Sequence, residues 1–193
     1  MTTAFRLAGA ALLLGGALLV SGGCAAGRTA AIPALPPAAA GETRVIEGVP
    51  FLPQEEETCG PSSLAMLLRF HGKEAATREL VEETRTAGLR GTLITDLAAA
   101  ARRRGVEAGV ADLDLPGLRR RILAGEPVIL LVDLGTWVWS RPHYLVAYGV
   151  TADGVVAHSG RSEATVIPYD SLEAQWAKMG HLAIVVPPEG GKQ

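Results

Sequence analysis

The feature that most constrains the fold is a change in hydrophobic pattern near the middle of the chain. Upstream, apolar side chains recur at helical spacing in four segments, at residues 61–71, 77–87, 95–104 and 118–124. Downstream lie apolar runs of strand length, at residues 127–133, 143–150, 155–157, 164–167 and 182–186, with one short helix near 171–178. Hairpin signals such as Asp153-Gly154 separate these runs. Helices followed by strands predict an α+β domain with an antiparallel sheet.

The N-terminal segment has the pattern of a secretory signal. Arg6 precedes apolar and small residues at 7–20, which is short for a bilayer-spanning helix of about 20 residues. Residues 25–43 are rich in Ala and Pro and have few large side chains, which favours a flexible tether. We therefore expect a signal peptide at 1–23, a tether at 24–43, one folded domain at 44–188 and a tail at 189–193.

The residues before Cys24 resemble the lipobox of bacterial lipoproteins, with Ser21 where that motif usually has Leu. The resemblance implies cleavage before Cys24 and lipidation of its thiol. Because Cys24 is followed by Ala25 rather than by an acidic residue, the resemblance also implies that the chain is anchored to the outer membrane, with the domain on the periplasmic side. Two alternatives stay open, an ordinary secretory signal with an incidental cysteine and an uncleaved anchor.

Charge and cysteine content exclude several classes of protein. The net charge of −2, from 18 basic and 20 acidic residues, gives no basic footprint for nucleic acid. Two cysteines cannot form a four-thiolate zinc site, and the chain has no HExxH motif for metal or GxSxG motif for serine hydrolysis. We expect no cofactor, no metal, no nucleic-acid partner, and contact with a membrane only through the lipid anchor.

Cys59 is the candidate nucleophile. It stands at the start of the first predicted helix, where unpaired N–H groups and the helix dipole favour a thiolate. Gly60 would let a substrate approach the backbone, and the N–H of Cys59 could donate to the oxygen of an attacked carbonyl. Gln54, five residues earlier, could supply a second donor. The alternatives are that Cys59 is a small buried apolar residue and that Gln54 is an ordinary loop residue.

His143 is the candidate general base among the four histidines. It opens an apolar run directly after Pro142, so its side chain lies at a strand end and can project toward a helix terminus. His71 and His181 are more simply core or surface residues, and a strand-end histidine without a catalytic role is the alternative for His143. Trp137 and Trp139 precede this strand. Two roles stay open for them, lining a substrate cleft or packing as buried aromatic residues at the edge of the sheet.

The run from Gln54 to Gly72, with its Cys-Gly-Pro-Ser-Ser-Leu-Ala-Met core, and the His-Tyr-Leu-Val-Ala-Tyr-Gly-Val strand at 143–150 resemble the papain-like peptidases that process bacteriocin leaders, also called double-glycine peptidases. The similarity spans about residues 49–187. It implies a papain-like fold, with N-terminal helices carrying the cysteine and a C-terminal sheet carrying the histidine. It also implies that Cys59 attacks peptide bonds through a thioester, with His143 as base and Gln54 in the oxyanion hole.

The chain departs from that family at Ser159, which stands where an Asp usually orients the histidine. A serine hydroxyl can accept a hydrogen bond from imidazole, but it cannot stabilise imidazolium as a carboxylate would. We expect a standalone, lipid-anchored cysteine peptidase acting on a peptide or protein. The alternative is a catalytically silent peptide-binding module of the same fold, and acyl transfer by the thioester route also stays open.

Overall fold

The computed structural model describes residues 43–86, 88 and 91–187. The predicted signal peptide, Cys24, all but the last residue of the predicted tether, and the predicted tail lie outside the described residues. In the part of the chain that is described, no helix has the length and apolar character needed to span a bilayer.

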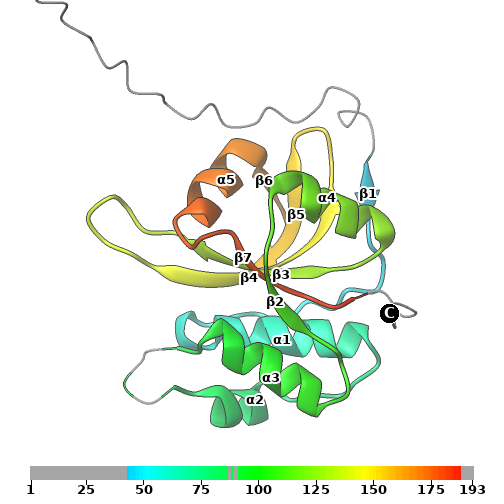
Figure 1. Ribbon diagram of the computed structural model, residues 1–193, viewed down its shortest axis with the longest axis vertical. Helices are drawn as coiled ribbons and strands as arrows, with labels where there is room; N and C mark the ends of the chain where they lie inside the picture. Colours follow the sequence, from blue (N-terminus) through cyan, green and yellow to red (C-terminus); the bar gives the residue numbers. More distant parts are fainter. Residues whose placement is uncertain (1–42, 87, 89–90, 188–193) are drawn as a thin grey trace, which may run out of the picture. The chain divides into compact units, whose positions relative to one another are not determined.

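The chain forms a seven-stranded antiparallel sheet with helices on both faces (Figure 1). In chain order the elements are β1 (Arg44–Val45), the 3-10 turn η2 (Glu56–Thr58), α1 (Cys59–Phe70), α2 (Thr77–Thr84), α3 (Ile94–Arg103), β2 (Gly109–Asp112), α4 (Leu115–Ala124), β3 (Val128–Asp133), β4 (Pro142–Val150), β5 (Gly154–Ser159), β6 (Ser162–Pro168), α5 (Tyr169–Ala177) and β7 (Leu182–Val185). The strand order is β2-β7-β3-β4-β5-β6, and β1 pairs with the end of β4. The predicted α+β class with an antiparallel sheet is confirmed.

Two hydrophobic cores hold the layers together, one on each face of the sheet. Helices α1 to α3 cover one face, and α4 and α5 cover the other (Figure 1). Strand β4 shows the division, because Tyr144 and Val146 belong to the first core while Leu145 and Ala147 belong to the second. All six residues of β3 are buried, which explains its continuous aliphatic sequence.

Helix ends follow local chemistry, with small differences from the predicted bounds. Helix α1 ends just before Gly72, which has a φ of +69° that suits glycine. Helix α4 begins at Leu115, three residues earlier than predicted, because the Asp114 carboxylate accepts a 2.7 Å hydrogen bond from the Gly117 N–H and caps the first turn. Helix α2 ends at Thr84 rather than at residue 87.

Two short strands lie where the local strand signal is weak. In the segment before η2, only Arg44–Val45 pairs as a strand. Strand β2 was not predicted, and it separates α3 from α4 while pairing with β7. Its sequence Gly-Val-Ala-Asp has a single β-branched residue and alternates between intermediate and exposed positions at the sheet edge, so it carries little strand signal.

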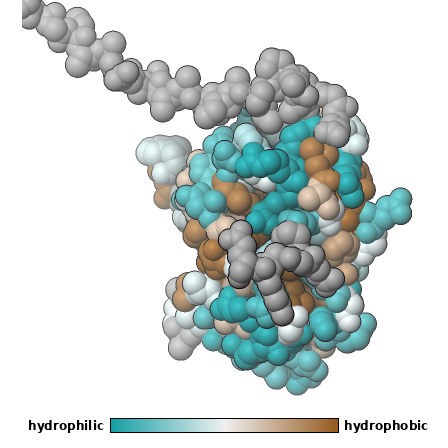
Figure 2. All heavy atoms as spheres, turned by 45° about the vertical axis from the view of Figure 1, so that its right-hand side comes forward, coloured by the Kyte–Doolittle hydropathy of each residue, from teal (hydrophilic) through white to brown (hydrophobic). Residues whose placement is uncertain are grey.

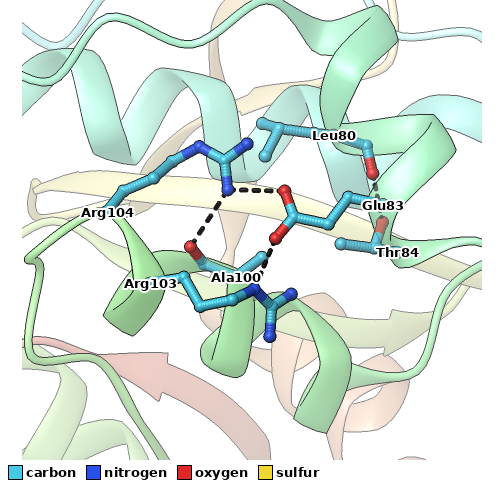
Figure 3. A network of polar contacts seen from close by, with 6 residues as sticks. All are labelled: Leu80, Glu83, Thr84, Ala100, Arg103 and Arg104. Carbon is cyan, nitrogen blue, oxygen red and sulfur yellow. Dashed lines mark hydrogen bonds and ion pairs between the residues drawn. The ribbon is translucent and has the colours of Figure 1, made fainter.

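A charged network joins α2 to α3 (Figure 3). The Glu83 carboxylate bonds to Nε of Arg103 at 2.6 Å and to an Nη atom of Arg104 at 2.5 Å. Burial alone would raise the pKa of Glu83, but the hydrogen bonds from the two arginines outweigh it and lower that pKa. The lower part of the space-filling view, where these helices lie, is mainly hydrophilic (Figure 2). By linking α2 to the end of α3, the Glu83 network holds these two helices together in the layer that contains Cys59.

Candidate active site

Cys59 is the first residue of α1, and its side chain is buried, at 7% exposed. The turn η2 leads the chain directly into the helix, so the cysteine stands at the N-terminal end of α1. Ten of the twelve residues of α1 are buried between the sheet and the other helices, which makes this helix a rigid support. The position places the thiol at the positive end of a helix dipole.

The Gln54 side chain ties the start of α1 to the turn after β5. Its Oε1 accepts a 2.8 Å hydrogen bond from the backbone N–H of Gly160, and its own backbone N–H donates to the Gly160 carbonyl at 2.8 Å. Because a backbone N–H can only donate, this contact fixes which end of the amide is oxygen. The Nε2 group therefore faces α1, where it lies 2.7 Å from Oγ of Ser63 and 3.4 Å from the carbonyl oxygen of Cys59.

His143 is the second residue of β4, and its Nε2 lies 3.1 Å from Oγ of Ser159, the last residue of β5. Burial, and then the positive charge of Arg141, together lower the pKa of His143 to about 4. The imidazole is thus neutral at pH 7. No carboxylate is hydrogen-bonded to this ring among the described residues, so nothing of opposite charge offsets the effect of burial.

The residues that follow the cysteine and the histidine touch each other. A Cβ atom built on Gly60 would lie 3.1 Å from Cδ2 of the Tyr144 ring, so only glycine fits there without a shift. The Tyr144 hydroxyl donates to the carbonyl oxygen of Thr92 at 3.0 Å, which fixes the ring against α1 and the segment before α3. The N-terminus of α1 and the start of β4 are therefore neighbours, and the Gln54 contacts join the same region to Ser159.

A cavity of about 390 Å³ opens beside Cys59. Cys59 and Gly60 form one side, and Leu131 and Tyr144 of the sheet form another. The remaining walls come from the chain before and at the start of α3, from the start of β4, and from the segment that leads into β7, with exposed Glu57 on the rim. The cysteine therefore faces a hollow large enough for part of a substrate.

Asp133 fixes the loop that leads to His143. Its buried Oδ1 accepts hydrogen bonds from the backbone N–H groups of Gly135 and Arg141, both at 2.7 Å. Burial would raise the pKa of Asp133, but these hydrogen bonds outweigh it and lower that pKa. At the tip of this loop Trp137 and Trp139 are 93% and 59% exposed, so neither is a buried aromatic at the sheet edge.

Other histidines have structural contacts. The His158 ring lies 4.3 Å from the Tyr148 ring, and its Nε2 is 3.3 Å from the carbonyl oxygen of Val49. His181 bonds to Glu173 at 2.8 Å. Among residues 43–86, 88 and 91–187, no group of three or more acidic, histidine or cysteine side chains is placed to hold a metal ion.

Sequence reasoning missed three residues that shape the site. Ser63 holds the Gln54 amide, Tyr144 braces Gly60, and Asp133 orders the loop before the histidine. Ser63 and Tyr144 lie within the motifs that carried the family resemblance, so those motifs were the available signal. The hydrogen-bond partners of these three residues, however, lie 9, 52 and up to 8 positions away along the chain, where the partner of Tyr144 is the carbonyl oxygen of Thr92, and only the fold brings them together.

A cysteine at a helix N-terminus, packed beside a strand that carries a histidine in an antiparallel sheet, defines the papain-like class of cysteine peptidase folds. The model of the Peptidase C39 family matches residues 50–189, and the chain belongs to this family. The predicted resemblance to double-glycine peptidases is confirmed. None of the curated proteins compared with the chain matches it.

Solved structures share the fold. A protein from Bacillus anthracis described as C39-like matches with a TM-score of 0.63 and 19% identity, over 76% of this chain and 98% of its own. The peptidase domain of Streptococcus ComA, a bi-functional ABC transporter, matches with a TM-score of 0.58 and 23% identity over 72% and 98% of the two chains. A double glycine motif protease from an AMS/PCAT transporter, in complex with its leader peptide, matches with a TM-score of 0.59 and 21% identity over 75% and 95%.

Proposed function

We propose that this chain is an active cysteine peptidase that hydrolyses peptide bonds in a peptide or protein substrate, with Cys59 as nucleophile and His143 as general base. The observation that carries the proposal is the Gln54 side chain, which joins the start of the Cys59 helix to the turn beside Ser159, the partner of His143. Family membership and a structural neighbour that holds a leader peptide support the substrate class.

The neutral state of His143 suits the role of base. Because burial, and then Arg141, lower its pKa to about 4, the imidazole can accept a proton at neutral pH. Because its Nε2 is engaged with Ser159, we propose that Nδ1 is the atom that accepts the proton of the Cys59 thiol. The sulfur attacks the carbonyl carbon, the proton passes through His143 to the leaving amine, and the C–N bond breaks to leave a thioester. Water, deprotonated by the same imidazole, then hydrolyses the thioester.

The developing oxyanion needs two donors. The backbone N–H of Cys59 supplies the first from the helix N-terminus. Gln54 supplies the second from Nε2, whose 2.7 Å bond to Ser63 anchors the amide. The other contact of Nε2, to the Cys59 carbonyl, is 3.4 Å long and therefore weak, so that N–H can turn to the substrate oxygen at little energetic expense.

A silent peptide-binding module is the second candidate function. Ser159 favours it, because a hydroxyl cannot stabilise the imidazolium that forms when His143 accepts a proton. The low pKa of His143 points in the same direction, since it makes the imidazole a weak base. The cleft would then capture a peptide without cleaving it.

The cellular setting is a further part of the proposal. We propose that the chain is a lipoprotein anchored through Cys24, with the peptidase domain on the periplasmic side of the outer membrane. The short apolar segment and the lipobox-like residues before Cys24 support this. Intact-mass measurement of the chain from bacterial membranes tests it, with an acylated N-terminal Cys24 as the expected product. A mass that retains residues 1–23, or an unmodified cysteine, would contradict it.

The peptidase proposal is tested with the full chain and its Cys59→Ser and His143→Ala variants. Each is incubated with a defined mixture of synthetic peptides, and new termini are identified by mass spectrometry. We expect cleavage products with the unmodified chain and none with Cys59→Ser or His143→Ala. Binding of peptides without cleavage by all three proteins would favour the silent module instead.

A further inference from the structure

We propose that His158 is a positioning residue of the oxyanion hole, whose buried imidazole holds Gln54 in place only while the ring is neutral. The residue lies on β5, one position before Ser159, and it is 2% exposed. It acts through Gln54 rather than on the reacting atoms. The inference rests on the proposed function, in which Gln54 donates to the oxyanion, and it makes that site dependent on pH.

Two backbone groups from different segments fix the tautomer of the His158 ring. The N–H of Ala164, on β6, lies 3.3 Å from Nδ1, so this nitrogen accepts a hydrogen bond. The carbonyl oxygen of Val49 lies 3.3 Å from Nε2, so this nitrogen carries the proton. The neutral ring therefore satisfies both groups, whereas a second proton at Nδ1 would set one N–H against another.

The contact with Ala164 lies at an irregularity of the sheet beside the site. The register of the β5–β6 pair shifts between Ala157 and Ser159, so two residues of β6 face His158. One of them, Ala164, has a φ of +53°, a conformation that is strained for a residue with a side chain. The ring supplies an acceptor for this strained segment, and it thereby supports the end of β5, where Ser159 and Gly160 follow.

A short arm connects the other ring nitrogen to Gln54. Val49, whose carbonyl accepts from Nε2, stands five residues before Gln54, and two prolines restrict the backbone between them. The Phe51 ring, within this arm, lies 5.2 Å from the His158 ring. At its end, Gln54 is bound to Gly160 by two 2.8 Å hydrogen bonds. His158 thus contacts both segments that fix the Gln54 amide.

The charges around the ring determine when it takes a second proton. Burial, the largest cause, lowers the pKa of His158, while the hydrogen bond to Val49 and the negative charge of exposed Glu163 raise it less. Tyr148 also packs on the ring, but burial and Glu163 raise the pKa of that phenol, so it stays neutral. The net pKa of His158 lies below 6.5, so the ring is neutral at pH 7 and protonates in acid.

Two reactions of Cys59 separate the oxyanion hole from the thiol. In alkylation by iodoacetamide, the S–C bond forms as iodide leaves, and no oxyanion develops. In acylation by 4-nitrophenyl acetate, the sulfur attacks the ester carbonyl, an oxyanion forms, and the C–O bond breaks to leave a thioester and nitrophenolate. The ratio of acylation rate to alkylation rate therefore reports on the hole, because protonation of Cys59 or His143 slows both reactions alike.

The ratio is measured in the full chain carrying Cys24→Ser, so that one thiol remains. Gln54→Ala sets the scale, because loss of one oxyanion donor slows such reactions roughly 100- to 1,000-fold. In the parent chain we expect the ratio to fall about tenfold or more from about pH 7.5 to about pH 4.5.

Substitutions of two histidines locate the effect. His158→Gln keeps one donor and one acceptor but cannot be protonated, so its ratio should stay constant across this range. His158→Phe lacks both ring nitrogens and should have a low ratio at every pH. His181→Gln is the matched control, because His181 bonds to Glu173 on α5, and it should follow the parent chain.

The outcomes separate the inference from the proposed function. If the ratio of the parent chain does not change with pH, or falls equally in His158→Gln, the role of His158 is overturned while the Cys59–His143 pair stands. If Gln54→Ala leaves the ratio unchanged, Gln54 is not in the hole and the inference fails with it. If Cys59 is not acylated and its alkylation is equally fast in His143→Ala, the proposed function itself fails.

Discussion

Replacing Ser159 by Asp should raise the pKa of His143 and thereby restore a charge that the site lacks. The Ser159 hydroxyl lies 3.1 Å from Nε2 of His143, so a carboxylate at this position comes within hydrogen-bonding distance of the ring. A carboxylate stabilises the protonated imidazole, whereas the hydroxyl stabilises it only weakly. The substitution therefore opposes the effect of burial, the first cause of the low pKa.

The size of the effect follows from Coulomb's law. Two unit charges about 4 Å apart interact by about 4 kcal/mol at an effective dielectric constant of about 20, and one pH unit corresponds to about 1.4 kcal/mol. Opposite charges at such distances change a pKa by roughly 1 to 3 units in proteins. The pKa of His143, lowered to about 4 in the native chain, should rise to between about 5 and 7.

NMR titration of the His143 ring measures this change directly. A Cys59→Ser background removes coupling to the thiol, so that the observed pKa belongs to the histidine alone. Ser159→Asn is the matched control, because it has the size of Asp without the charge. A rise of one unit or more with Asp and little change with Asn is expected. Equal shifts in the two variants, or no rise with Asp, would refute the reasoning.

Three further results are expected. Because folding lowers the pKa of His143 from 6.5 to about 4, the free energy of unfolding decreases as the pH falls from about 6.5 to about 4. Thermal unfolding across this range should show that His143→Gln loses about 3 kcal/mol less of this free energy than the native chain does. Asp133→Ala leaves two backbone N–H groups unpaired, and urea unfolding should show a loss of about 3 kcal/mol, against a clearly smaller loss for Asp133→Asn. Glu83→Gln should lower the free energy of unfolding by about 1 kcal/mol in the same assay, and by less in high salt, because the ion pairs to Arg103 and Arg104 are screened. A loss that does not depend on salt would contradict an ionic origin for this stabilisation.

The elements with strong local signals could be predicted from the sequence. Helix α1 was expected from apolar residues at helical spacing at 61–71, and β3 from its apolar run at 127–133. Strand β2 could not be predicted, because it is a short edge strand that owes its conformation to pairing with β7. The start of α4 was misplaced because Asp114 caps the helix before its first strongly apolar stretch.

The site was predictable in its residue types but not in its contacts. The residues around Cys59 and those of the strand that carries His143 have a recognisable order along the chain. The two hydrogen bonds that join Gln54 to Gly160 span 106 positions, and no local pattern encodes such a distance. The effect of burial on the pKa of His143 likewise depends on packing from several elements, which a single sequence does not display.

The most direct test of the account is the pH dependence of iodoacetamide alkylation at Cys59, in the full chain carrying Cys24→Ser so that one thiol remains. If the neutral imidazole of His143 accepts the Cys59 proton, alkylation continues at pH values well below the ordinary thiol pKa of about 8.5, and His143→Ala restricts it to the pH range near that value. A rate profile whose midpoint lies near about 8.5 and is indifferent to His143 would contradict the Cys59–His143 pair.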